Sequence, residues 1–298
     1  MELNWMRTNK IPQDLRSFQQ DEIRNSCLRL SHDLLRNYDE FAHKGTRGHA
    51  AILAGNRGMM GAAILSTQAA IRSGAGKITA IVPEPMFALI HTAVPEALVC
   101  SQEEFQFKIS SYSAIAAGPG LGNTESTIEW LKILFKFQKP LILDADALNT
   151  ISSNKDLLSL IPKGSLLTPH QLEAERLVGS ELSDYYLIKA LYEICIRHNI
   201  NILLKNHFSV LLTPSGEFYI NGTGNSGMGK AGSGDVLTGL LAGLAAQGLS
   251  LSESAILGAC IHGLAGDLAK EEIGEDAMCA TDQIMFLSKA FKMLRNWT

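Results

Sequence analysis

The 298-residue sequence lacks several features, and each absence argues against a class of protein. There is no excess of basic residues, because 26 Lys and Arg face 30 Asp and Glu, and the formal net charge of −4 gives no drive toward nucleic acid. The five cysteines show no close pairing and no CxxC spacing, which argues against a disulfide framework and a zinc site. The longest apolar helix candidate, 236–246, is too short to span a bilayer.

The first ten residues, MELNWMRTNK, also lack the basic region and apolar core of a secretory signal. Apolar residues make up 46% and charged residues 19% of the chain, proportions typical of a well-buried globular protein. Scattered, unpaired cysteines are typical of a reducing compartment. These features predict a cytoplasmic protein with neither a membrane nor a nucleic acid as its partner.

Residues 1–42 form a polar and charged segment that precedes the apolar part of the chain. Leu28, Leu30, Leu34 and Leu35 suit one side of a helix within it. We expect an arm or helix that packs on the main domain or on a partner subunit, and no chemistry is apparent in it. The main domain is expected to occupy residues 43–298.

From residue 43 onward, short apolar runs alternate with helix-like segments. We expect strands at 50–55, 77–84, 113–122 (ending in a glycine turn), 140–148, 165–170 and 201–205, and a hairpin over 209–220. Helices are expected at 61–76, 124–137, 184–198, 251–270 and 282–294, with another after 170. The alternation predicts an α/β fold with a mainly parallel, doubly wound sheet and helices on both faces.

The residues that follow these strands form the candidate site, because ligands of open α/β sheets bind beyond the carboxyl ends of the strands. The suggestive positions are Asn56, Gly118 to Gly122, Asp144, Asp146, Thr168 to His170, Lys205 and the loop before Asp235.

The glycine-rich stretch 221–248 reads NGTGNSGMGKAGSGDVLTGLLAGLAAQG, with six glycines between Gly222 and Gly234. We expect Asp235 to be the N-cap of a helix that begins at Val236. A glycine-rich loop leading into a helix N-terminus binds anions such as phosphate. A carboxylate beside phosphate is explained if it removes a proton from a nucleophile or holds a cation. The alternative is a flexible linker followed by a helix that Asp235 caps.

From His43 to about Lys289 the sequence resembles the ADP-dependent NAD(P)H-hydrate dehydratases, whose ribokinase-like fold has three α/β/α layers. The motifs that carry the resemblance occur in the order HKGTRGHAAILAGNRGMMGAAILSTQAAIRSGAGK, GPGLG, LILDADALN, LTPH, LLK at Lys205 and NGTGNSGMGKAGSGDVLTG. The resemblance implies repair of hydrated NADH or NADPH. ADP, or ATP in some members, phosphorylates the hydroxyl group, and the loss of phosphate restores NAD(P)H and leaves AMP. Mg²⁺ and a homo-oligomer are further implications.

The resemblance also implies a role for individual residues. Asp235 is implied as the base for the substrate hydroxyl, and Gly232, Ser233 and Gly234 as donors of N–H groups to the transferring phosphoryl. Nucleotide contacts are implied for Lys205, Asn206, His207, Phe208, Ser209, Asn221 and Gly234. Substrate contacts are implied for Ala62, Gly118, Gly120, His170 and Asp235. Asp144 is a candidate Mg²⁺ ligand.

Three segments depart from the pattern of the family. Ala231 replaces the first glycine of Gly-Gly-Thr-Gly-Asp, at a cost of about 1 kcal/mol if the position needs a positive φ. Asn206 replaces the glycine after Lys205, and the usual Pro-Gly-Glu is Gln171-Leu172-Glu173, which predicts a different helix start beside His170.

Two other functions fit the same residues. An ATP-dependent kinase of the ribokinase type, acting on a small alcohol such as a vitamin precursor, would use the same loop and the same Asp235. A nucleotide-binding protein without activity fits the departures at Ala231 and Gln171. Outside the site, His262 is interpreted as a core histidine, Asp146 as a helix cap, and Gly239 and Gly243 as positions of close helix packing.

Overall fold

A computed structural model of the chain describes residues 7–8 and 20–297. Its strands form one sheet in the order β1-β10-β9-β8-β7-β6-β5-β2-β3-β4. The strands are β1 (Arg7–Thr8), β2 (His49–Leu53), β3 (Lys77–Ile81), β4 (Leu98–Cys100), β5 (Ala114–Ala117), β6 (Ile142–Leu143), β7 (Leu166–Leu167), β8 (Asn201–Leu204), β9 (Ser209–Leu212) and β10 (Phe218–Asn221). Strands β2 to β8 run parallel, whereas β9, β10 and β1 pair antiparallel at one edge.

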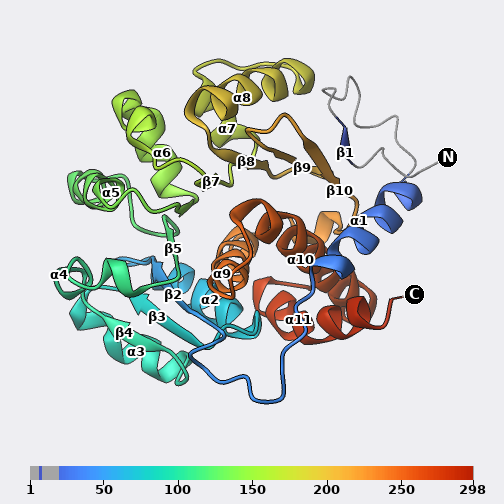
Figure 1. The fold of residues 1–298 in the computed structure, drawn as a ribbon, viewed down its shortest axis with the longest axis horizontal. Helices are drawn as coiled ribbons and strands as arrows, with labels where there is room; N and C mark the ends of the chain where they lie inside the picture. Colours follow the sequence, from blue (N-terminus) through green and yellow to red (C-terminus); the bar gives the residue numbers. More distant parts are fainter. Residues whose placement is uncertain (1–6, 9–19, 298) are drawn as a thin grey trace.

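Helices cover both faces of the sheet (Figure 1). They are α1 (Gln20–Leu34), α2 (Met60–Arg72), α3 (Phe87–Ala93), α4 (Gln102–Phe105), α5 (Glu125–Lys136), α6 (Asp146–Ser153), α7 (Gln171–Val178), α8 (Asp184–His198), α9 (Ser233–Ala246), α10 (Leu251–Ile273) and α11 (Ala280–Arg295). The expected α/β architecture with a mainly parallel sheet is therefore confirmed.

The apolar strand sequences explain the layers, because side chains alternate between the two faces of a strand. In β2, Ala51 and Leu53 join a core with α5 to α8, whereas Ala50 and Ile52 join a core with α2, α9 and α10. A third apolar cluster joins residues of α9 and α10 to residues of α1 and α11. The sheet is thus buried on both faces, which leaves the ends of its strands as the places where functional groups can meet a ligand.

Helix α1 belongs to this third cluster, where Ile23, Cys27 and Leu28 are buried against α10, α11 and β10. Residues 20–34 of the expected N-terminal arm or helix thus form a helix that lies against the main domain. Residues 1–6 and 9–19 of the expected arm lie outside the described residues.

The strand expected over 140–148 is wrong beyond Leu143. Helix α6 begins at Asp146 instead, because Ala147, Leu148 and Ile151 recur at helical spacing and are buried together. The chain turns between strand and helix at Ala145, a non-glycine residue at φ 48° and ψ −118°. Helix α3 and strand β4 have no counterpart in the expectations from the sequence.

Asp235 is not the N-cap of the glycine-rich loop's helix, so that expectation is also wrong. Helix α9 begins at Ser233, and its N-cap is Gly232 at φ 91°. A glycine reaches this left-handed conformation without a steric penalty, so the helix starts three residues earlier than an N-cap at Asp235 would place it. Asp235 lies in the first turn, where a carboxylate interacts favourably with the helix dipole.

Candidate active site

A cavity of about 500 Å³ opens at the carboxyl ends of β7 and β8. Its lining comes from segments far apart in the sequence: His170, Lys205–His207, Ser209, Asn221, Thr223–Ser226, Met228–Lys230, Ser233, Gly234, Leu237, Ala259, His262 and Gly263. The volume suits a small ligand such as a nucleotide. Eight residues expected at the site line it: His170, Lys205, Asn206, His207, Ser209, Asn221, Ser233 and Gly234.

The N-terminus of α9 presents free donors to this cavity. The N–H group of Ser233 donates to the carbonyl of Lys230 over 3.4 Å, and that of Val236 to the carbonyl of Gly232 over 3.0 Å. Within the described part of the chain, the N–H groups of Gly234 and Asp235 have no acceptor. Two free N–H groups at the positive end of a helix form an anion site.

Lys205 lies at the end of β8 and forms an ion pair with Asp144, which follows β6. Its Nζ donates to Oδ1 of Asp144 over 2.7 Å, and Thr238 Oγ1 donates to Oδ2 over 2.6 Å. The Asp144 side chain is only 2% exposed, so the pair is shielded from screening by solvent. A Cβ placed on Gly234 would lie 3.4 Å from that Nζ and 3.8 Å from Asp144 Oδ2. Lys205, Asp144 and the start of α9 therefore meet at one point.

Asp235 lies beside this group of charges. Burial raises its pKa from 3.8 to about 6, the Asp144 and Asp146 carboxylates act in the same direction, and Lys205 opposes them. A carboxylate with this pKa is ionised at neutral pH, and it is a stronger base than an exposed aspartate. Asp235 can thus accept a proton next to a phosphate site.

Asp144 and Asp146 reach the site through the turn at Ala145. A backbone conformation of this kind costs about 1–3 kcal/mol and persists where the surrounding structure enforces it. Gly118 makes room for the turn, since a Cβ there would lie 1.8 Å from the carbonyl oxygen of Asp144. Asp146 caps no helix N-terminus, as it is the first residue of α6, and its Oδ2 accepts from the N–H of Gly122 over 2.8 Å.

His170 is the N-cap of α7. A helix therefore begins directly after it, although Gln171-Leu172-Glu173 replaces the usual Pro-Gly-Glu of the family. Its Nδ1 accepts from the N–H of Glu173 over 3.3 Å, and its own N–H donates to Oε2 of Glu173 over 2.9 Å. The buried Glu173 carboxylate also lies 4.0 Å from Lys205 Nζ. Glu173 was missed from the sequence, although its spacing of three residues after a cap is that of a capping box.

Ala62 and Gly120, two of the expected substrate contacts, lie together away from the lining of the cavity. A Cβ on Gly120 would lie 3.0 Å from the Cβ of Ala62 and 2.9 Å from the carbonyl oxygen of Met59. Gly120 at φ 67° therefore permits the turn after β5 to approach the start of α2. With Gly118 and Asp144, these residues form a second group outside the lining of the cavity.

Phe208 is the expected nucleotide contact that does not line the cavity. Its ring packs on the apolar cluster of α1, α10 and α11 and meets the ring of His207 at 4.6 Å between centroids. Asn206 needs no left-handed conformation, because its φ is negative, and its Oδ1 accepts from the N–H of His207 over 2.7 Å.

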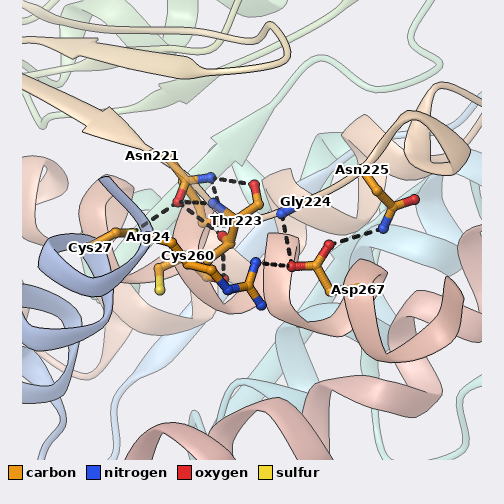
Figure 2. Close-up of polar contacts among 9 residues, drawn as sticks. Arg24, Cys27, Asn221, Thr223, Gly224, Asn225, Cys260 and Asp267 are labelled. Atoms are coloured by element: carbon orange, nitrogen blue, oxygen red, sulfur yellow. Dashed lines mark hydrogen bonds and ion pairs between the residues drawn. The ribbon is translucent and has the colours of Figure 1, made fainter. Parts of the chain in front are cut away.

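Asn221 lines the cavity, but its side chain is used within the protein. Its Oδ1 accepts from Thr223 Oγ1 and Cys27 Sγ, each over 3.0 Å, and its Nδ2 donates to the carbonyl of Thr223 over 3.1 Å (Figure 2). Asn221 therefore shapes the loop that follows β10. Arg24 and Asp267, which hold the next part of this loop, were missed from the sequence because they lie in segments with no motif.

His262 is a core histidine, as expected, and it also lines the floor of the cavity. Its Nε2 donates to Oε1 of the buried Gln283 over 3.0 Å, and the same oxygen accepts from Ser233 Oγ over 2.9 Å. Burial lowers its pKa to about 4, so the imidazole is neutral at physiological pH. The Ser233 hydroxyl therefore hydrogen-bonds to Gln283 of α11, next to His262 of α10.

A metal ion has few protein ligands here. Among residues 7–8 and 20–297, no three His, Cys, Asp or Glu side chains group as metal ligands do, and both Asp144 oxygens already accept hydrogen bonds. Mg²⁺ commonly binds through one or two carboxylates together with substrate phosphates. The described residues therefore do not form a site for the metal alone.

Comparisons with known proteins agree with this geometry. A family model described as NAD(P)H-hydrate dehydratase matches residues 50–288. The chain is 35% identical over 283 residues to an ADP-dependent (S)-NAD(P)H-hydrate dehydratase of Neisseria meningitidis, with 92% of this chain and 94% of that protein covered. The chain spans only 57% of the length of a bifunctional NAD(P)H-hydrate repair enzyme to which it is also 35% identical.

Solved structures agree as well. An ADP/ATP-dependent NAD(P)H-hydrate dehydratase of Bacillus subtilis, co-crystallised with ATP and Mg²⁺, superposes with a TM-score of 0.76 at 28% identity and covers 93% of this chain and 97% of its own. A ribokinase-like superfamily protein of Enterococcus faecalis superposes with a TM-score of 0.82 at 28% identity, with 90% and 94% covered. The fold is ribokinase-like, and the chain belongs to the NAD(P)H-hydrate dehydratase family.

Proposed function

We propose that the protein dehydrates hydrated NADH or NADPH back to NAD(P)H, with ADP as the phosphoryl donor and AMP and phosphate as the other products. The observation that carries this proposal is the position of Asp235. This half-buried aspartate has a pKa of about 6, and it lies at the start of α9, where its own N–H and that of Gly234 are free, beside a cavity of nucleotide size. Family membership supports the choice of substrate.

The proposed reaction begins with phosphoryl transfer. Asp235 takes the proton of the substrate hydroxyl, whose oxygen bonds to the β-phosphorus of ADP while the bond to the AMP oxygen breaks. Lys205 and the N–H groups of Gly234 and Asp235 stabilise the charge that develops on the phosphoryl oxygens. Phosphate is a better leaving group than hydroxide, so it departs with the electron pair of the C–O bond, the neighbouring ring carbon loses a proton, and the ring double bond is restored.

The two groups of residues then divide the ligands between them. The cavity side, with Lys205, His207 and Ser209, holds the nucleotide, and the side with Ala62, Gly118 and Gly120 holds the hydrated dinucleotide. His170, which lines the cavity, contacts either the substrate or the nucleotide phosphates. Mg²⁺, where present, would be held largely by the phosphates and would neutralise part of their charge.

The test is a turnover assay with hydrated NADH or NADPH and either ADP or ATP. We expect absorbance of the dihydronicotinamide to recover, with AMP released in equal amounts when ADP is the donor. Recovery with ADP and no phosphorylated alcohol distinguishes a dehydratase from a kinase of the same fold. The absence of recovery with both nucleotides would refute the proposal.

Asp235→Asn provides the matched variant. We expect its turnover to fall about 10³-fold, because the base is lost while the shape of the side chain is kept. ADP binding, measured by calorimetry, is expected to stay within a few-fold of the wild-type value. A variant that turns over at the wild-type rate would contradict the role of Asp235.

The oligomeric state and the cellular location of the protein are proposed from its membership of the family. We expect a homo-oligomer, which a mass from light scattering would test, and a cytoplasmic location. Within residues 7–8 and 20–297, none of the helices has the length and apolar character needed to cross a membrane.

A further inference from the structure

Helix α1 reaches the loop of the nucleotide cavity through an ion pair that the proposed reaction does not use. Arg24 Nη1 donates to Oδ2 of Asp267 on α10 over 2.5 Å, and the two side chains are 29% and 20% exposed (Figure 2). The two residues are 243 positions apart in the chain. The pair therefore ties the N-terminal helix to the helix that supports the cavity.

Asp267 also holds the loop itself. Its Oδ2 accepts from the N–H of Gly224 over 3.2 Å, and its Oδ1 accepts from Asn225 Nδ2 over 3.1 Å. Asn225 Oδ1 in turn accepts from the N–H of Gly227 over 3.0 Å and so caps the short turn Ser226–Met228. Gly224, Asn225, Ser226 and Met228 all line the cavity, so one carboxylate orients this part of its wall.

The backbone of α1 lies directly against the same loop. A Cβ on Gly222 would lie 2.7 Å from Cγ2 of Ile23 and 2.8 Å from the backbone nitrogen of Arg24. One turn further along α1, Cys27 Sγ donates to Oδ1 of Asn221 over 3.0 Å. Helix α1 thus contacts the loop at Asn221 and Gly222, and it holds Gly224 through Asp267.

The charge of Asp267 gives the ion pair a second effect. A carboxylate behind the wall of a cavity that takes phosphate repels the ligand unless a cation compensates it. Arg24 is the side chain that forms an ion pair with Asp267 among the described residues. Arg24 therefore lets Asp267 orient the loop without weakening the attraction of the cavity for anions.

We propose that Arg24 and Asp267 are positioning residues for the nucleotide, so that α1 is part of the active site. They fix the segment from Gly224 to Met228, and their opposite charges cancel, so no net negative charge lies behind this wall of the cavity. This inference rests on the proposed nucleotide role of the cavity, but its test measures binding of ADP alone and needs no turnover.

The first experiment is titration calorimetry with ADP on the full chain, at a temperature where every variant is fully folded. Arg24→Met is expected to raise the Kd for ADP about tenfold, which corresponds to about 1.4 kcal/mol. Arg24→Lys keeps the positive charge and is expected to recover most of the affinity. Arg29→Met, at an exposed position of the same helix, is the matched control and is expected to leave the Kd unchanged.

The second experiment changes the partner. Asp267→Asn is expected to raise the Kd for ADP several-fold, and the double variant Arg24→Met with Asp267→Asn is expected to be less than additive. Glu271→Gln, one turn further along α10 and exposed, is its control. In the hydrate assay, Arg24→Met is expected to raise the KM for ADP with kcat within about twofold.

The outcomes separate a positioning role from a structural one. If Arg24→Met lowers the Tm but leaves the Kd and KM for ADP at wild-type values, the pair stabilises the fold alone and the inference is wrong. Wild-type protein that binds ADP without converting the hydrate would refute the proposed function and leave this inference standing. Failure of the wild type to bind ADP or ATP would refute both.

Discussion

At the scale of single residues, the pKa of Asp235 leads to a pH prediction. Because the base must be ionised, kcat/KM is expected to fall about tenfold per pH unit below about 6. In Asp144→Asn, a neighbouring carboxylate is lost and Lys205 is released from its ion pair. Both changes favour the ionised form of Asp235, so the acid limb should move to lower pH. Steady-state rates between pH 4.5 and 8.5 check this, and an unmoved limb would contradict it.

The same pKa shift has a consequence for stability. Folding raises the pKa of this acid, so ionisation weakens the folded state as the pH rises through the interval from 3.8 to about 6. Above that interval, Asp235→Asn is expected to raise the free energy of unfolding by about 1 kcal/mol, because the variant no longer places a desolvated charge in the folded state. Active-site residues commonly reduce stability in this way. Thermal unfolding at pH 7.5 and pH 4 measures it, and the gain should be absent at the lower pH.

The sequence predicts those residues of the site that belong to a recognisable motif, and it does not predict the others. Lys205, Asp144 and Gly234 come together as their positions at strand ends and in the glycine-rich stretch suggest. Glu173 and Thr238 were not foreseen, because their roles depend on which side chains the fold brings to Asp144 and Lys205. The raised pKa of Asp235 depends on burial, which a sequence motif does not give.

At the scale of elements, the start of α9 determines which glycine of the loop is required. Gly232 has φ 91°, and a Cβ there would lie 2.6 Å from Cδ1 of Leu65 and 2.9 Å from the Cβ of Ala280. Ala231 is exposed and has no positive φ, so its departure from the family pattern carries no backbone strain. The expected cost at Ala231 therefore does not apply.

Two substitutions test this account of the loop. Gly232→Ala is expected to lower the free energy of unfolding by about 2 kcal/mol, because strain and steric contact add. Ala231→Gly is expected to change it by no more than about 0.5 kcal/mol. Urea unfolding followed by circular dichroism compares the two, and a clear stabilisation by Ala231→Gly would show that Ala231 is strained after all.

Element types were easier to predict than element boundaries. The strand at β2, the hairpin of β9 and β10, and helix α8 lie where the apolar patterns place them. The boundaries at β6 and α9 were wrong, because each depends on one residue with positive φ, Ala145 and Gly232. At Ala145 this conformation is unusual for a residue with a Cβ, so tertiary contacts rather than local propensity decide it.

At the scale of the whole molecule, α1 was expected to be an arm without chemistry, and its packing gives it a larger role. Ile23 is fully buried in the cluster shared by α1, α9, α10 and α11, and it lies against Gly222. If α1 folds as one unit with the sheet, a cavity at Ile23 weakens the entire domain. If α1 were a separately docked arm, the same cavity would release it at a lower temperature and leave the rest of the protein unchanged.

Ile23→Ala distinguishes these cases. We expect it to lower the free energy of unfolding by about 2–4 kcal/mol. Far-UV circular dichroism and the fluorescence of Trp130, measured with Trp5 and Trp297 replaced by Phe, should report one coincident transition at a lower temperature. Trp130 lies on α5 and packs against the core on the opposite face of the sheet. Asn25→Ala, at an exposed position of the same helix, is the control and is expected to unfold like the wild type. An early transition seen by circular dichroism alone would show that α1 unfolds separately from the sheet.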